Sequence, residues 1–127
     1  LLSANVINKT TNKPLVKPYV RLNKDGLKVV VVGLTTEDTA KLGNPDVIGK
    51  VKFEDPIKTA EKTLKQINKK EKPDVRIALT HMGWYLDGKH DTNAPGDVSM
   101  ARQLPKGSFN MIIGGHTHDT VCFDEKG

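Results

Sequence analysis

Blocks of apolar residues, separated by polar segments, predict an alternation of strands and helices along the chain. The run "LKVVVVGL", residues 27–34, is continuous, rich in β-branched side chains and too short for a helix, which is typical of a strand buried on both faces. Two further runs have the same character, "PDVRIALTHMG" and "FNMIIGG". They are predicted to be buried strands that end at His81 and His116.

The clearest helical signal covers residues 55–70, "DPIKTAEKTLKQINKK". Asp55 stands at the N-cap position, Pro56 at the first helical position, and lysines collect at the C-terminal end, where the helix dipole favours them. The residues at helical spacing are Ile57, Ala60, Leu64 and Ile67. A shorter helix is predicted through "DVSMARQL", with Asp97 as its N-cap. The order strand, helix, strand, helix, strand predicts an α/β domain with crossover connections.

Three other segments carry weaker signals. "LLSANVI" at the start predicts a short strand, and residues 8–26 form a polar, proline-punctuated stretch that predicts a hairpin with its turn at "NKDG". Residues 35–55 are mostly polar and predict a short helix within a long connection.

Composition limits what the chain can be. Its 127 residues suffice for one domain, and it has no apolar run near the roughly 18 residues needed to span a bilayer. The net charge of +5 comes mostly from lysine and aromatics are only 5%, so we expect a solvated basic surface rather than a nucleic-acid interface. Because the chain opens without Met or a signal peptide, we expect it to be a piece of a longer protein.

Histidines at the predicted strand ends are the candidate chemistry. Functional groups gather at the carboxyl ends of strands in open α/β sheets, and there the sequence places His81, His116 and His118. Gly114 and Gly115 allow a sharp turn before the H-x-H pair, whose rings share one side if the backbone is extended. A single histidine of this kind is more often a hydrogen-bonded structural residue. The conjunction of three favours a metal site.

The remaining candidates receive plainer interpretations. His90 lies in a polar loop and is expected to be exposed to solvent. Gly96 and Asp97 spell G-D, but Asp97 opens a helical pattern, so the N-cap role is preferred over a metal-binding one. Cys122 is the only cysteine, which excludes an internal disulfide and leaves a free thiol or a pairing outside the chain open.

The motifs "LTHMG", "GGHTHDTVC", "LLSANV" and "TNAPGDVSMARQLPKGS" together resemble one family. With "VVVVGLTTEDTAKLGNP" they are similar to the second half of the catalytic domain of bacterial periplasmic 5′-nucleotidases and UDP-sugar hydrolases, in the calcineurin-like metallophosphoesterase superfamily. The resemblance implies a four-layer α/β sandwich, in which mixed β-sheets are flanked by helices. It also implies a periplasmic or secreted location.

The same resemblance implies an activity and a cofactor. These enzymes hydrolyse nucleoside 5′-monophosphates and nucleotide-sugar pyrophosphates such as UDP-glucose with two divalent metal ions of the Zn, Mn, Co or Mg class. Carried over to this chain, His81 and His116 bind one metal. His118 takes the position of a ligand to the other metal, where some relatives have glutamine.

Some motifs of the family are missing from the sequence, and their absence also carries information. In the family, D-x-H, G-D and G-N-H motifs supply the bridging aspartate, further ligands and the catalytic histidine, and they precede the stretch that resembles "LLSANV". D-x-H and G-N-H are not found in residues 1–127, and the G-D pair at Gly96 and Asp97 lies between the histidine motifs, where the order is wrong. We therefore expect the chain to be the C-terminal half of a metallophosphoesterase catalytic domain, without its nucleotide-binding domain. It would contain no catalytic residue, hold at most one ion weakly and be inactive alone.

Two alternatives stay open at this point. A related 2′,3′-cyclic-nucleotide phosphodiesterase would share the metal motifs, and a non-catalytic metal-binding or nucleic-acid-binding module would bind without hydrolysis. Because half of a sheet sandwich would expose strand edges and an apolar face, we also expect self-association.

Overall fold

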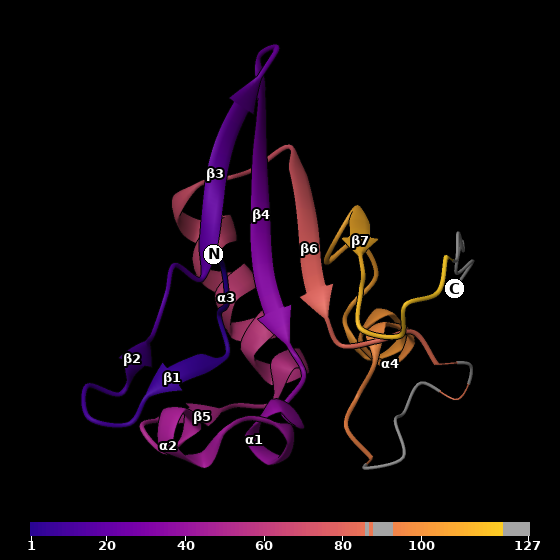
Figure 1. The fold of residues 1–127 in the computed structure, drawn as a ribbon. Helices are drawn as coiled ribbons and strands as arrows, with labels where there is room; N and C mark the ends of the chain where they lie inside the picture. The colour runs from indigo at the N-terminus through magenta and orange to yellow at the C-terminus, as the bar shows by residue number, and fades with distance from the viewer. Residues whose placement is uncertain (86, 88–92, 121–127) are drawn as a thin grey trace.

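The computed structural model describes residues 1–85, 87 and 93–120, with the elements arranged around two sheets (Figure 1). The strands are β1 (Val6–Asn8), β2 (Lys13–Pro14), β3 (Tyr19–Lys24), β4 (Leu27–Thr35), β5 (Val51–Phe53), β6 (Val75–His81) and β7 (Met111–Ile113). The helices are α1 (Thr39–Leu42), α2 (Pro45–Ile48), α3 (Pro56–Lys70) and α4 (Asp97–Gln103). None of the helices in these ranges is both long enough and apolar enough to cross a membrane.

The larger sheet has the order β3-β4-β6-β7 and confirms the predicted α/β architecture. β3 and β4 form an antiparallel hairpin whose turn, at Asp25 and Gly26, has φ angles of 50° and 82°, as the "NKDG" turn requires. β4, β6 and β7 then pair in parallel through crossovers that contain α3 and α4. The parallel register sets Thr35 opposite His81 and Leu79 opposite Ile113.

α3 begins and ends where the sequence indicates. The carboxylate of Asp55 accepts hydrogen bonds from the backbone N–H groups of Ile57 (2.9 Å) and Lys58 (3.1 Å), which satisfies two of the free donors at the helix start. Pro56 follows the cap, so the predicted N-cap is confirmed. The buried side chains of the helix include Ile57, Ala60, Leu64 and Ile67, the four predicted from spacing.

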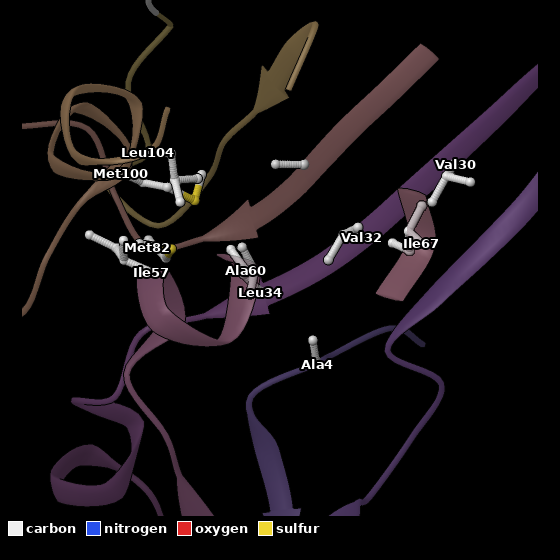
Figure 2. Packing of buried hydrophobic residues seen from close by; sticks show 11 residues of the cluster. Ala4, Val30, Val32, Leu34, Ile57, Ala60, Ile67, Met82, Met100 and Leu104 are labelled. Carbon is white, nitrogen blue, oxygen red and sulfur yellow. The ribbon is translucent and has the colours of Figure 1, made fainter. Parts of the chain in front are cut away.

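The core lies between α3 and one face of the larger sheet (Figure 2). Its buried members are Ala4, Val30, Val32, Leu34, Ile57, Ala60, Ile67, Ala78, Met82, Met100 and Leu104. Met100 and Leu104, at α4, lie near Met82, just beyond β6 (Figure 2). This packing ties α4 to the end of β6, where the first candidate histidine stands.

The prediction that the strands are buried on both faces is wrong for the described structure. In β4, Val30 and Val32 are buried, whereas Val29 and Val31 on the other face are only half-buried. The same opposite face carries three side chains that are about half exposed: Leu79 (44%), Met111 (56%) and Ile113 (46%). We call these three residues the open ladder. The apolar runs are continuous because both faces are apolar, although the described residues cover the second face only in part.

A second, smaller sheet has the order β2-β1-β5, and its β1 overlaps the predicted strand "LLSANVI". β5 comes from the long polar segment 35–55, which forms α1, α2 and β5 instead of one short helix. At three residues, β5 is too short to show a period in the sequence.

Asn5 joins the two sheets. Its side chain is fully buried, and its Nδ2 donates to the carbonyls of Thr35 (2.8 Å) and Glu54 (2.9 Å). Its Oδ1 accepts from the backbone N–H of Thr35 (3.0 Å) and the hydroxyl of Ser3 (3.3 Å). The amide therefore has all its hydrogen bonds satisfied, and it fixes the end of β4 beside β5.

We predict that Asn5→Ala lowers the free energy of unfolding by about 2–4 kcal/mol, because buried backbone groups of Thr35 and Glu54 lose their partners. Urea denaturation followed by circular dichroism measures the change. Asn8→Ala is the control, because Asn8 accepts only from an exposed turn at Thr10 and Thr11. Equal effects of the two substitutions would contradict the role given to Asn5.

Candidate metal centre

Two of the three predicted histidines meet at the carboxyl edge of the larger sheet. His81 is the last residue of β6, and His116 follows the end of β7 after Gly114 and Gly115. Because β6 and β7 are parallel neighbours, both residues leave the sheet at the same edge. Side chains alternate along a strand, so His81 shares its face with Leu79 of the open ladder.

The two imidazole rings are in contact. Nδ1 of His116 lies 3.3 Å from Nε2 of His81, the ring centroids are 4.9 Å apart, and the ring planes are inclined at 73°. His81 is exposed to solvent and His116 is half-buried, so an ion from solution has access to the pair. Nitrogen atoms of this kind are suitable ligands for zinc and similar divalent ions.

His118 does not join them in the described structure. An extended backbone would place the rings of His116 and His118 on one side, but their φ angles are 92° and 61°, so the backbone is turned there and this condition is not met. Within residues 1–85, 87 and 93–120, no three metal-ligating side chains gather closely enough to hold an ion. His90 and Cys122 lie outside the described residues.

Asp97 is the residue that the sequence reasoning misjudged. The N-cap of α4 is Gly96, and no side chain caps the helix, so the predicted capping role of Asp97 is wrong. Its carboxylate Oδ1 instead accepts a hydrogen bond of 2.6 Å from the hydroxyl of Thr80, inside the protein. Burial raises the pKa of the Asp97 carboxyl above its ordinary value of 3.8, and the hydrogen bond from Thr80 acts in the opposite direction.

A signal for this placement was present in the string "GDVSM". Val98 and Met100 are buried, so the helix starts against the core and its first residue is buried as well. A carboxylate at such a position needs a hydrogen-bond donor, and Thr80 is on the buried face of β6.

Gly114 is required by the position of Asp97. A Cβ atom on Gly114 would collide with Oδ2 of Asp97, so no larger residue fits without displacing the carboxylate. At Gly115 a Cβ would lie 3.6 Å from both the Thr80 carbonyl oxygen and Nδ1 of His81, which is ordinary contact. The first glycine of "GGHTH" is therefore required because a side chain would not fit there, whereas the second position has room for a Cβ atom.

Comparison with known proteins shows the family. The family model described as calcineurin-like phosphoesterase matches residues 5–120, nearly the whole chain. The chain belongs to the calcineurin-like phosphoesterase family. The resemblance seen in the motifs is thus confirmed.

Individual members of the calcineurin-like phosphoesterases are close in sequence. The chain is 53% identical over 124 residues to the 5′-nucleotidase of Vibrio cholerae, and 54% identical over 122 residues to protein UshA of Yersinia enterocolitica. These alignments cover 98% and 96% of the chain, but only 22% of each relative. The chain therefore spans about a fifth of the length of these relatives.

A solved structure confirms the fold. The 5′-nucleotidase precursor of Thermus thermophilus superimposes with a TM-score of 0.71 at 31% identity, over 92% of this chain and 20% of that one. Calcineurin-like phosphoesterases are enzymes that use two metal ions. The metal ligands of this chain are a separate question, because neither the comparisons nor the described residues test them.

We predict that Gly114→Ala lowers the free energy of unfolding by about 1–3 kcal/mol, because the added methyl group displaces the Asp97 carboxylate. Gly115→Ala is the matched control and should be nearly neutral. The double variant Gly114→Ala with Asp97→Ala should lose less stability than the sum of the two single variants. Additive losses in urea denaturation would show that the two residues do not collide.

Proposed function

We propose that His81 and His116 together bind one divalent metal ion of a phosphohydrolase site. The observation that supports this most directly is the 3.3 Å separation of Nδ1 of His116 and Nε2 of His81. Two nitrogens, each about 2.0–2.1 Å from a tetrahedrally coordinated zinc ion, are about 3.3 Å apart. The same separation also suits an N–H···N hydrogen bond, which two neutral imidazoles would form without an ion.

His118 is proposed as a ligand to the second metal of the pair. The assignment rests on the place of His118 in "GGHTH", two residues after His116. Because the described residues bring no third ligand to His81 and His116, the coordination of either ion needs groups beyond these three histidines. Residues 1–127 are accordingly proposed as the second half of a metallophosphoesterase catalytic domain.

The substrates follow from the relatives and are likewise proposals. The chain is similar to a 5′-nucleotidase and to UshA, which supports hydrolysis of nucleoside 5′-monophosphates and nucleotide-sugar pyrophosphates by the complete enzyme. Two bound ions would activate water and polarise the phosphoryl oxygens. The part played by this chain is to position imidazole nitrogens at the sheet edge. The site is proposed to act in the periplasm, as in the family that the motifs resemble.

We predict that the 127-residue chain binds Zn²⁺ in isothermal titration calorimetry, with one weakly held ion. His81→Ala and His116→Ala should each weaken binding by more than about tenfold, because each removes a ligand. His90→Ala is the matched control, since the metal motifs do not include it. Zn²⁺ affinity that is unaffected by His81→Ala and His116→Ala would contradict the site.

The activity assay uses AMP and UDP-glucose with added Mn²⁺, Co²⁺ or Zn²⁺, and the 5′-nucleotidase of Vibrio cholerae as the positive control. We expect hydrolysis by the control and none by the isolated chain, because the chain lacks the D-x-H and G-N-H motifs. Hydrolysis by the chain would mean that the three histidines suffice, and would overturn the proposed division of the catalytic domain.

Self-association through the open ladder is a further proposal. Leu79, Met111 and Ile113 expose apolar surface beside β7, which is the last strand of its sheet in the described structure. We predict concentration-dependent association in sedimentation velocity, and its loss in Met111→Lys. Leu42→Lys is the control, because Leu42 is 72% exposed on α1, away from the ladder. A clean monomer at high concentration would contradict the proposal.

A further inference from the structure

Asp97 is a buried carboxyl group that neither the fold nor the proposed metal binding accounts for. It is 7% exposed and lies at the start of α4 without capping the helix. A buried carboxylate is unfavourable unless it is hydrogen-bonded, and the Thr80 hydroxyl, 2.6 Å away, provides a bond. An apolar residue would fill the same space without this cost, so the carboxylate calls for a specific role.

The contacts of Asp97 flank both histidines. Thr80, which donates to its carboxylate, directly precedes His81. The backbone N–H of Asp97 donates to the carbonyl of Gly83 (2.8 Å), two residues after His81. The other carboxylate oxygen, Oδ2, lies against Gly114, two residues before His116. One residue of α4 thus touches the segments that carry both imidazoles.

The loop that carries His116 needs such support. The pairing of β6 with β7 ends at Leu79 and Ile113, so the strand ladder does not extend to Gly114 and beyond. His116 has a φ angle of 92°, a left-handed conformation that costs a non-glycine residue of order 1–3 kcal/mol. A strained residue persists only when its surroundings fix it, and Asp97 packs against the backbone just before it.

We infer that Asp97, held by Thr80, is a positioning residue that fixes the "GGHTH" loop so that the rings of His116 and His81 face each other. The inference rests on the proposed function, in that the ring pair is the metal site. Asp97 acts through Thr80 and Gly114 and is not itself assigned as a ligand. Thr80, Asp97 and Gly114 are called the loop brace below.

The test uses the full 127-residue chain and substitutions at Thr80. Thr80→Val keeps the shape and removes the hydroxyl that holds Asp97, whereas Thr80→Ser keeps the hydroxyl. Thr63→Val is the matched control, because Thr63 is as buried as Thr80 (7% and 6% exposed) but lies on α3. Asp97→Ala removes the carboxylate directly, and circular dichroism establishes that each variant is folded at the temperature used.

Two measurements are made on each variant. The first is the NMR nuclear Overhauser effect between the rings of His81 and His116 without metal, which reports their contact directly. The second is the dissociation constant for Zn²⁺ from calorimetry. We expect Thr80→Val and Asp97→Ala to lose the inter-ring signal and to weaken Zn²⁺ binding by about tenfold. Thr80→Ser should restore both quantities, and Thr63→Val should change neither, even where it lowers stability.

The outcomes separate this inference from the proposed function. If Thr80→Val keeps the inter-ring signal and the Zn²⁺ affinity, or if Thr63→Val lowers both equally, the loop brace is overturned and the metal site stands. If the unmodified chain binds no Zn²⁺ while Thr80→Val still abolishes the inter-ring signal, the metal site is overturned and the brace stands.

Discussion

Because β4, β6 and β7 pair in parallel, their carboxyl ends meet at one edge of the sheet, and every candidate functional residue depends on that alignment. The register places Thr35 opposite His81, and Asn5 fixes Thr35 from the smaller sheet. The end of β6 is therefore fixed by its pairing with β4, whose own end is fixed by Asn5. Parallel pairing requires crossovers, which explains why α3 and α4 lie between the strands in the sequence.

Two locally unfavourable features lie at that edge of the sheet. Asp97 keeps a carboxyl group in a place where burial raises its pKa, and His116 holds a φ angle that few non-glycine residues adopt. Each feature is unfavourable by itself. The two are close together, because the Asp97 carboxylate lies against Gly114, two residues before His116. Such features persist where the surrounding structure fixes them, and here Asp97 contacts the two segments that bring the imidazoles of His81 and His116 together.

The sequence predicted the elements whose signals are local and regular. The α3 helix has a cap, a proline and an apolar spacing, and the hairpin turn has glycine at the required position, so both were found. The sequence also placed His81 and His116 at the carboxyl ends of strands, and in the structure their rings are in contact. The pairing within the smaller sheet was not predicted, because its strands are too short to show a period. The hydrogen-bond partner of Asp97 was not predicted either, because the bond from Thr80 joins residues 17 positions apart. The residues of the open ladder were predicted to be buried because they are apolar, and the sequence does not show whether another part of the protein covers them.

The open ladder and His81 lie on the same face of the larger sheet. Side-chain alternation in β6 puts Leu79 and His81 on one face, while Ala78 and Thr80 face the core. A structure that covers Leu79, Met111 and Ile113 must therefore approach from the side on which His81 is exposed. Burial of apolar area would supply the favourable free energy for that approach. On this geometry, a structure that covers the open ladder would lie beside the proposed metal site.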